Sequence, residues 1–579
     1  MKLLKTGKMS QPVKIKAFIL SLVTFLVLGI FPAVQSAHSE IIGSDRRIDW
    51  EPGLLQEKAP YPVYANVKNS PYNASGDGLA DDTSAIQNAI NDAPPGSAVY
   101  LPDGTYRVTN QLNINKGIVL RGNGPDKTKI LNYKNSTGNI LRLGGNGSSS
   151  SVSITGGTTK GSNQITVSST SGVSVGDYIR IYQDNDPSLV DNAGCNWCGD
   201  NGQHLMAQIV KIDAISANVL TLNRPLYYTF KAAQNPEFRK ISMTVGVGIE
   251  DLFIQKVYSG GGYSDTNNIL VRGVANSWIR NIESYNAVGA HVRMVNSYAS
   301  EISNSFFHHG HSYGSGRAYG VFLFNRNSDV LVENNIFYFL RHSVVLESGG
   351  SGNVIAYNYS RRMFGDSDPV NTNWLMADLS THGAHPYMNL FEGNTAQHIG
   401  PDYTWGSASH NTYFRNYIIR ENEGVNGMAT YHLNAVDVQT KNYYMNIVGN
   451  ILCKDDSCSG SYDVGSSSSA SAKGIYRLGY SYDGSSSQSD TNVENTLYRH
   501  GNFDFITDTT IWDTTNPDHN LPDSLYLLAK PVFFGSKSWP VYGPDLDPKV
   551  GVLPAEERFL LGYGEKPTPP VILSIEVSP

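Results

Sequence analysis

Side chains that move protons or bind anions are concentrated in the middle of this chain. Ten of its fourteen histidines lie between His291 and His432, and the stretch 257–440 contains ten arginines and no lysine. Histidine exchanges protons near neutral pH. The guanidinium fork of arginine holds carboxylate or sulfate groups through paired hydrogen bonds. These residue types indicate acid–base chemistry on an anionic ligand, and the alternative is a solvated surface on which arginine replaces lysine.

For a polymer of uronic acids, the chemistry that suits these side chains is β-elimination. A base removes the proton next to the sugar carboxylate, a cation neutralises that carboxylate, and an acid protonates the leaving oxygen. The candidates are His382 or His385 as base, Arg362 or Arg415 as cation, and Tyr387 or Tyr403 as acid. Each histidine taken singly has a simpler interpretation as a loop residue that is hydrogen-bonded to the backbone.

Hydrolysis needs a different set of groups, namely two carboxylates. They stand about 5–5.5 Å apart in enzymes that retain the anomeric configuration and about 6.5–9.5 Å apart in enzymes that invert it. Asp366, Asp368 and Asp402 are the candidates. Both reactions therefore stay open.

Aromatic and polar side chains near these residues are suited to holding a sugar. Tryptophan and tyrosine pack their faces on the apolar faces of sugar rings while their polar edges stay wet. The predicted substrate-binding residues are His309, His311, Tyr313, Arg317, Trp374, Tyr387, Trp405 and His410. The predicted ligand is a polysaccharide, and the arginines favour an acidic one.

A repeat in the same region explains how these residues are brought together. A short strand pattern ending in asparagine recurs at Asn281, Asn304, Asn335, Asn358, Asn394, Asn416 and Asn450, with steps of 23, 31, 23, 36, 22 and 34 residues. A fixed period with insertions at one phase is typical of a solenoid whose loops project from one side. Since stacked strands lie about 4.8 Å apart, the insertions are expected to line one groove. The asparagines themselves are expected to form a structural ladder.

The N-terminal part carries a more specific pattern. A predicted strand at 63–67 precedes Gly76-Asp77-Gly78, a helix with Ala85, Ile86, Ala89 and Ile90 on one stripe, and two further strands. Residues 65–108, ANVKNSPYNASGDGLADDTSAIQNAINDAPPGSAVYLPDGTYRV, resemble the N-terminal segment of the pectate lyase superfamily, in its rhamnogalacturonase and epimerase-like branch. The matching residues are Gly76, Asp77, Gly78, Asp82, Thr83, Ile86, Ala89, Tyr100, Pro102, Gly104 and Tyr106.

The resemblance implies an all-β protein, a right-handed parallel β-helix whose first coil is capped by the α-helix. Such folds host lyases, hydrolases, epimerases and depolymerases, so the reaction has to be argued from the site. The predicted organisation is a signal peptide at 1–37, a linker at 38–60, an N-terminal cap and first coils at 61–149, an inserted small β module at 150–245, central coils with long loops at 246–455, a loop-rich C-terminal cap at 456–565, and a linker or further domain at 566–579.

The first residues predict export. Five lysines precede an apolar run at 17–31 and small residues near Ser36 and Ala37, as in a signal peptide. The run is short for a membrane span, which needs about 20 residues, although a membrane anchor is the alternative. Removal of residues 1–37 leaves 39 basic against 51 acidic groups, a net charge near −12. The predictions are a secreted or cell-surface protein, no nucleic-acid partner, and no membrane association after cleavage.

The four cysteines form two local pairs. In an exported protein, Cys195 with Cys198 and Cys453 with Cys458 are expected to form disulfides, and a zinc site is the alternative. Asp184, Asp186 and Asp191 are candidate Ca²⁺ ligands, although acidic turns of this kind are more often solvated.

Together these features predict a secreted carbohydrate-active enzyme that cleaves an acidic polysaccharide by β-elimination. The alternatives are a glycoside hydrolase or epimerase on the same fold, and a non-catalytic glycan-binding surface protein.

Overall fold

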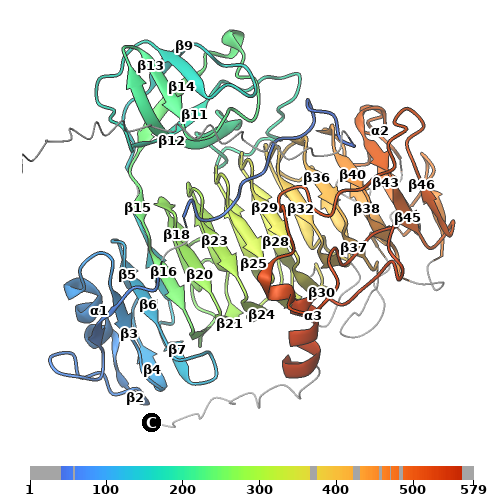
Figure 1. Ribbon diagram of the computed structural model, residues 1–579. Coiled ribbons are helices and arrows are strands. Elements are labelled where there is room, and N and C mark those ends of the chain that lie inside the picture. Colours follow the sequence, from blue (N-terminus) through green and yellow to red (C-terminus); the bar gives the residue numbers. More distant parts are fainter. Residues whose placement is uncertain are drawn as a thin grey trace, which may run out of the picture. The chain divides into compact units, whose positions relative to one another are not determined.

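The computed structural model describes residues 41–56, 59–145, 147–365, 375–420, 431–454, 459–469, 471–481 and 487–563. The candidates Asp366, Asp368, Trp374 and Cys458 and the predicted signal peptide lie outside these residues. Most of the described chain forms short strands in three long sheets (Figure 1). Among the described residues no helix is both long enough and apolar enough to span a bilayer.

Each coil contributes one strand to each of three sheets, which we call A, B and C. Sheet A contains β1 Val63–Asn66, β3 Ala98–Tyr100, β6 Val119–Arg121, β16 Gly248–Glu250, β20 Trp278–Arg280, β23 Glu301–Ser303, β26 Leu331–Glu333, β29 Val354–Ala356, β32 Leu390–Glu392, β36 Thr412–Phe414, β40 Asn446–Val448 and β44 Tyr498–His500. Sheet B contains β2 Asp77–Asp81, β4 Gly104–Val108, β7 Thr128–Asn132, β17 Phe253–Lys256, β21 Glu283–Ala287, β24 Phe306–Gly310, β27 Ile336–Leu340, β30 Tyr359–Met363, β33 Thr395–Ala396, β37 Tyr417–Ile418, β41 Ile451–Leu452, β45 Asn502–Asp504 and β46 Thr509–Ile511.

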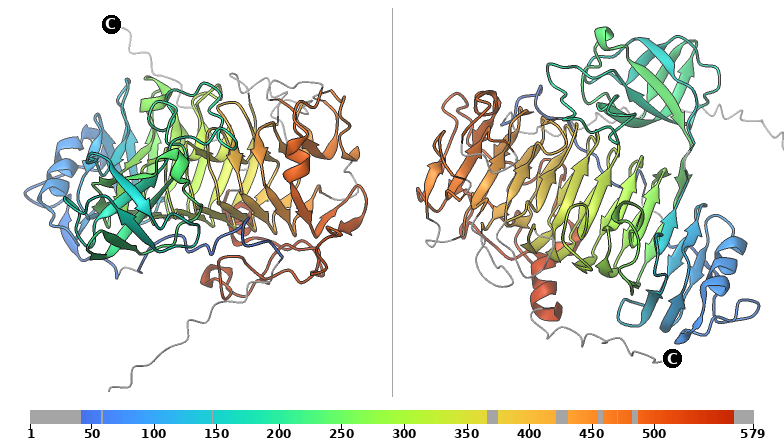
Figure 2. Two further views of the ribbon diagram at one scale, coloured as in Figure 1. Left: turned by 90° about the horizontal axis from the view of Figure 1, so that it is seen from above. Right: turned by 180° about the vertical axis from the view of Figure 1, so that it is seen from behind.

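Sheet C contains β5 Leu112–Ile114, β8 Leu141–Leu143, β18 Ile269–Arg272, β22 Ala290–Val295, β25 Tyr319–Phe324, β28 His342–Glu347, β31 Leu379–Thr381, β34 Ile399–Pro401, β38 Asn434–Val438, β43 Gly474–Leu478 and β42 Ser461–Asp463. Neighbouring strands within the coils pair in parallel, for example β22 with β25 and β25 with β28. The predicted right-handed parallel β-helix is confirmed, and Figure 2 shows its stacked rows of strands in two further views.

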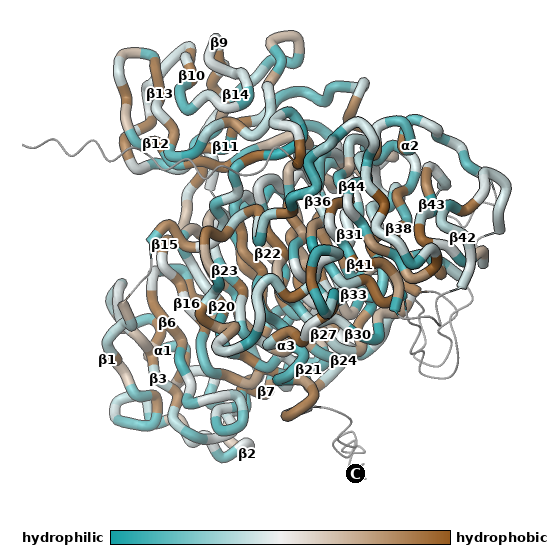
Figure 3. Tube along the Cα trace, turned by 45° about the vertical axis from the view of Figure 1, so that its right-hand side comes forward, coloured by the Kyte–Doolittle hydropathy of each residue, from teal (hydrophilic) through white to brown (hydrophobic). Residues whose placement is uncertain are grey.

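Alternation along each strand fills the interior. In sheet C, Val292 and Met294 of β22 pair with Val321 and Leu323 of β25, and all four belong to the main hydrophobic core. Arg293, between the first two, therefore lies on the outer face, because successive side chains of a strand point to opposite sides. Hydrophobic residues recur along the strands of the coils in Figure 3.

The corner between sheets A and B carries the asparagine ladder. Asn335, Asn358, Asn394, Asn416 and Asn450 each donate a side-chain N–H to the amide oxygen of the next asparagine, at 2.9–3.0 Å, and the row ends at Asn502. All are buried. These side chains therefore satisfy one another and the backbone of the corner.

Asn281 and Asn304 do not belong to this ladder, although the sequence pattern aligned them with it. They lie one position earlier, at φ of 50° and 54°, where later coils have Tyr357, Gly393 and Arg415. Ser305 occupies the ladder position of its own coil and accepts the Ile282 N–H. Asparagine tolerates the left-handed conformation of such a turn, which explains why the two positions looked alike in sequence.

Two elements interrupt or close the coils. Helix α1 (Thr83–Asp92) buries Ile86, Ala89 and Ile90 in the core at the first coil, as predicted. The inserted module is a closed six-stranded barrel made of β9 Val152–Gly156, β10 Gln164–Val167, β11 Tyr178–Tyr182, β12 Ala207–Ser216, β13 Val219–Leu222 and β14 Glu237–Ile241.

Shorter elements complete the structure: α2 Asn492–Thr496, α3 Pro554–Arg558, and the strand pairs β15 Thr244–Val245 with β19 Val274–Ala275 and β35 Ala408–Ser409 with β39 Asn442–Tyr443. Residues 41–56 of the expected linker pack on the coils. Trp50 is buried and donates its indole N–H to the Met388 carbonyl at 2.8 Å.

Candidate active site on the outer face of sheet C

Three ionisable side chains from successive coils stand side by side on sheet C. Strand pairing aligns Leu346 with Thr381 and Thr381 with Pro401. The next residues, Glu347, His382 and Asp402, therefore continue the same row. Since successive coils lie about 4.8 Å apart, the backbones of Glu347 and Asp402 stand about 9.6 Å apart in space. His382 lies between them.

His382 and Asp402 form a tight pair. His382 Nδ1 lies 2.7 Å from Asp402 Oδ2, while Thr404 N–H donates to Asp402 Oδ1 at 2.9 Å. Burial raises the pKa of the Asp402 carboxyl, but the charge and hydrogen bond of His382 and the hydrogen bonds of Thr404 together lower it by more, so that the net shift is downward. Burial lowers the pKa of His382, but Asp402 raises it by more, and the net shift is upward. The pair therefore holds Asp402 ionised.

Glu347 has the opposite character. It is only 4% exposed, and burial raises the pKa of its carboxyl to about 7. Trp197 donates its indole N–H to Glu347 Oε1 at 3.3 Å. The row thus offers a carboxylic acid that is protonated near neutral pH two coils away from an ionised carboxylate, which is the division needed for general acid–base work.

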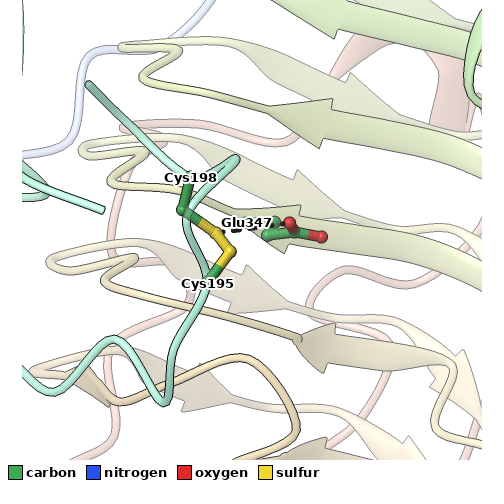
Figure 4. Close-up of side chains that lie close together, drawn as sticks. All are labelled: Cys195, Cys198 and Glu347. Atoms are coloured by element: carbon green, nitrogen blue, oxygen red, sulfur yellow. Dashed lines mark hydrogen bonds between the residues drawn. A yellow bond between two sulfur atoms is a disulfide. The ribbon is translucent and has the colours of Figure 1, made fainter. Parts of the chain in front are cut away.

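A loop of the inserted barrel covers Glu347. Cys195 and Cys198 form a disulfide, and Trp197 between them lies with its ring centroid 4.5 Å from that of Trp405 at an angle of 73°. Figure 4 shows the disulfide beside the Glu347 carboxyl. Trp197 is 47% exposed and Trp405 is partly exposed. The two rings therefore form an aromatic surface next to the ionisable row.

The sulfurs of Cys195 and Cys198 and the Glu347 carboxyl are, among the described residues, the one group of His, Cys, Asp and Glu side chains close enough to share a metal ion. Both sulfurs are bonded to each other. Because the thiolate is the form that binds metal, this group does not fit a metal site. Cys198 Sγ lies 3.6 Å from Glu347 Oε1, and without a proton on the sulfur this is only a contact.

His342 adds a buried, unpaired acceptor beside the row. Its Nδ1 lies 2.8 Å from the Ala377 carbonyl and therefore carries the proton, while its Nε2 is buried without a hydrogen-bond partner. Burial lowers the pKa of His342 to about 3, so the ring is neutral. Its centroid lies 5.8 Å from that of His382. A buried, unpartnered ring nitrogen is suited to accept a hydroxyl hydrogen from a ligand.

Several predicted catalytic residues lie elsewhere. Arg415 is at the corner between sheets A and B, where both its Nη atoms bind the Asp545 carboxylate at 2.8 Å. Its turn position directs it away from sheet C. Arg362 belongs to β30 of sheet B and lies over the Tyr338 ring. Sheet and turn position therefore separate both arginines from His382.

His385 and Tyr387 are buried structural residues. The two ring nitrogens of His385 each lie 2.8 Å from a serine hydroxyl, those of Ser407 and Ser409. Burial lowers the pKa of His385 to about 3. Tyr387 donates its hydroxyl to the Ala207 carbonyl at 3.0 Å. Tyr403 is hydrogen-bonded to Asp191. The side chains of His385, Tyr387 and Tyr403 are thus held by partners outside the row Glu347–His382–Asp402.

The predicted substrate-binding residues also separate. Trp405 lies in the cluster, but His309 stacks on Phe339 with ring centroids 4.8 Å apart, and His410 stacks on Tyr444 at the same distance. The remaining contacts are His311 Nε2 with the Lys256 carbonyl at 2.9 Å, the Tyr313 hydroxyl with Gly310 N–H at 3.2 Å, and the Arg317 guanidinium over the Tyr263 ring at 5.6 Å. Most of these residues are therefore fixed by neighbouring side chains or backbone.

The three candidate Ca²⁺ ligands do not gather. Asp186 pairs with Lys231 and Ser188, Asp184 lies 3.3 Å from His204 Nε2, and Asp191 accepts the Ala193 N–H. The disulfide Cys195–Cys198 is present as expected. Cys453 is also disulfide-bonded.

Sequence reasoning missed Glu347, His342 and Trp197. Glu347 ends a short strand with no insertion beside it, so that no motif marked it. One signal was available: its steps of 35 and 20 residues to His382 and Asp402 follow those of 36 and 22 between the ladder residues Asn358, Asn394 and Asn416. Trp197 reaches the site from the barrel, 150 residues away in sequence, which periodicity cannot reveal.

Comparison with known proteins agrees with this fold. Residues 64–225 match the family model described as rhamnogalacturonase A/epimerase, pectate lyase-like. The resemblance to the pectate lyase superfamily is confirmed. The match covers the N-terminal coils and most of the barrel, and ends before the Glu347 row. No curated protein matched the chain in sequence.

Among solved structures, the tailspike gp61 of Pseudomonas phage phi297 matches with a TM-score of 0.50 and 13% identity, over 68% of this chain and 64% of the tailspike. The chain thus spans slightly less than two thirds of that protein. The tailspike gp49 of Pseudomonas phage LKA1 has a TM-score of 0.47, 19% identity and coverage of 69% and 67%. The A-module of the Azotobacter vinelandii mannuronan C-5 epimerase AlgE4 has a TM-score of 0.33, 16% identity and coverage of 67% and 87%. At 13% identity, the likeness to the phi297 tailspike shows the β-helix fold alone.

Proposed function

We propose that the protein is an exported enzyme that hydrolyses glycosidic bonds in an acidic polysaccharide. The observation that carries this proposal is the row Glu347–His382–Asp402, in which a protonated carboxyl and an ionised carboxylate stand two coils apart. Their backbones stand about 9.6 Å apart, which excludes neither carboxyl from a spacing of about 6.5–9.5 Å, the one found between the carboxyls of inverting glycosidases.

Each group has a defined role in this reaction. Glu347 gives its proton to the oxygen of the glycosidic bond as that bond breaks. The His382–Asp402 pair takes a proton from the water whose oxygen bonds to the anomeric carbon. After cleavage, Glu347 is ionised and the pair is protonated, and exchange with solvent restores both. His342 Nε2 accepts a hydrogen bond from a sugar hydroxyl.

A sugar polymer suits the surroundings of the row. Trp197 and Trp405 offer aromatic faces on which sugar rings pack, and the row lies on a stacked sheet along which a chain of sugar units extends over several coils. The pectate lyase-like family match adds support for carbohydrate chemistry. Export follows from the predicted signal peptide.

β-Elimination is the second candidate, and one observation favours it. His382 has a raised pKa, which makes its neutral form a stronger base. Elimination also needs a cation on the sugar carboxylate. Arg362 and Arg415 lie elsewhere, but the charge of Arg293 acts on Glu347 and that of Arg341 acts on His382. Hydrolysis is the first choice because the row combines a protonated carboxyl with an ionised carboxylate. In an epimerase or a non-catalytic glycan-binding protein, the Glu347 carboxyl would not protonate a leaving oxygen.

The test is incubation of the purified protein with a panel of uronic-acid polymers. Reducing ends released without new ultraviolet absorbance support hydrolysis. Reducing ends with absorbance from an unsaturated sugar end refute hydrolysis in favour of elimination. A change in the sugar ratio without cleavage indicates epimerisation, and binding without any product indicates a binding protein; either outcome refutes the proposal.

A further inference from the structure

A polar cavity lies between the inserted barrel and the coils, and none of its residues belongs to the row Glu347–His382–Asp402. Its volume is about 310 Å³, and its charged and amide lining consists of Arg180, Arg239, Arg326, Asp200, Asn296 and Asn325. Arg180 and Arg239 come from barrel strands β11 and β14, and Arg326 follows β25 of sheet C. We call these three residues the arginine pocket.

Asp200 is the carboxylate that all three arginines share. Its oxygens lie 3.5 Å from Arg180 Nη2, 3.6 Å from Arg239 Nη1 and 3.0 Å from Arg326 Nη1. His204 Nδ1 also lies 2.9 Å from Asp200. Among the groups that line the cavity, three guanidinium charges thus face one carboxylate, which leaves an excess of positive charge.

Two of the three guanidinium groups are buried, whereas the side chain of Arg239 is 28% exposed. Arg180 is 5% exposed and Arg326 is 1% exposed. Burial, together with the neighbouring Arg326, lowers the pKa of Arg180 to about 9. Charge removed from water is costly unless it is paired. The pocket is therefore electrostatically incomplete and favours an added anion.

Unused hydrogen-bonding groups surround the same cavity. The Nε atoms of Arg180 and Arg239 and the side-chain oxygens of Asn296 and Asn325 are buried without partners. The Nε groups are donors and the asparagine oxygens are acceptors. A ligand that carries both a carboxylate and hydroxyl groups, as a uronic acid unit does, offers partners to both kinds.

The pocket lies directly beside the proposed active site. Asn325 donates its backbone N–H to the Glu347 carbonyl, and Arg326 donates to the Ser348 carbonyl, both at 2.9 Å. One coil, about 4.8 Å, thus separates the backbone of the pocket from that of Glu347. The barrel loop connects them too, since Trp197 contacts Glu347 and Asp200 binds the arginines.

We propose that the arginine pocket binds the carboxylate of a uronic acid unit neighbouring the cleaved bond, and so selects an acidic polysaccharide. This inference rests on the proposed function for its link to cleavage. The planar guanidinium groups suit a carboxylate, which they can hold through paired hydrogen bonds. The barrel supplies Arg180 and Arg239 and thereby acts as a substrate-recognition module.

Binding is tested in the Glu347→Gln variant, so that no cleavage is needed. Oligogalacturonate and oligoglucuronate are titrated by calorimetry, with their methyl esters and sulfated galactan oligosaccharides as comparisons. Addition of Arg239→Gln is expected to weaken binding of at least one uronate oligomer about tenfold or more. The methyl esters should bind to the Glu347→Gln protein as weakly as the free acids bind to the double variant that also carries Arg239→Gln. Lys211→Gln, which removes the same charge from the barrel outside the pocket, should leave affinity unchanged.

Arg239→Lys keeps the charge but loses the planar fork, and an intermediate affinity is expected. It also serves as the test if Arg239→Gln does not fold, in which case unchanged affinity refutes the inference. Equal binding by Arg239→Gln and its parent, or a preference for the sulfated oligosaccharides over both uronates, overturns it as well. If uronates bind through Arg239 but nothing is cleaved by the native protein, the proposed function fails and the pocket stands. If cleavage occurs with unchanged KM in Arg239→Gln, the pocket fails and the proposed function stands.

Discussion

The corner between sheets A and B and the outer face of sheet C are made by the same stacking of coils, but they carry different residues. At the corner, six successive coils place asparagine at one position, and each side chain donates to the next until the row ends at Asn502. On sheet C, three successive coils place Glu347, His382 and Asp402. The comparison teaches that identical residues in a row stabilise the coil, whereas different ionisable residues in a row give carboxyls with opposite protonation.

Among the variants that test this difference between corner and sheet, Glu347→Gln is expected to have the largest effect on the rate. The amide keeps the shape of the side chain but has no proton to give, and loss of a general acid costs about 10²–10⁴-fold in rate. We expect kcat for polymer cleavage to fall by that amount while the melting temperature stays within a few degrees.

Glu283→Gln is the matched control. Burial also raises the pKa of Glu283 to about 7, but this residue lies on sheet B. Its replacement should leave cleavage unchanged. Equal losses in the two variants would mean that a buried carboxyl matters only for folding, and the assignment of Glu347 would be wrong.

The pH dependence of kcat/KM should show which group limits the reaction. Glu347 must be protonated to act, and its raised pKa of about 7 means that activity falls about tenfold per pH unit above that value. The lowered pKa of Asp402 keeps it ionised into the acid range. A rate that does not fall above pH 7 would contradict Glu347 as the general acid.

At the corner, Asn394→Ala should affect stability rather than chemistry. It leaves buried backbone and amide groups unpaired above and below, which costs about 1–3 kcal/mol. Asn281→Gly, at an exposed turn position with φ of 50°, should change the free energy of unfolding by less than about 0.5 kcal/mol. Denaturant unfolding measures both, and similar losses would refute the distinction between ladder and turn asparagines.

The smallest effect is expected at the aromatic surface. Trp197→Ala removes one ring face, worth about 0.5–1.5 kcal/mol, so KM should rise about two- to tenfold with little change in kcat. Tyr258→Ala, another exposed aromatic, is the control and should leave KM unaltered. A fall in kcat alone would mean that Trp197 acts on Glu347 rather than on the sugar.

The sequence predicted the coil well and the site only in part. The regular asparagine steps and the segment at 65–108 specify stacked strands and the capping helix because both depend on local patterns. His382 and Asp402 were among the predicted residues and lie in contact. Arg415 was misplaced because a turn position, one residue before the ladder, decides the direction of its side chain. Glu347 and the arginine pocket depend on register and on the docking of the barrel, which sequence spacing does not encode.

The most direct test of the account is the anomeric configuration of the first product, followed by proton NMR during cleavage. The backbones of Glu347 and Asp402 stand about 9.6 Å apart, and with the carboxyls far enough apart to hold a water molecule the account predicts that the configuration is inverted. A product formed with retained configuration would require the two carboxyls to act at about 5–5.5 Å, and would contradict the roles assigned to Glu347 and Asp402.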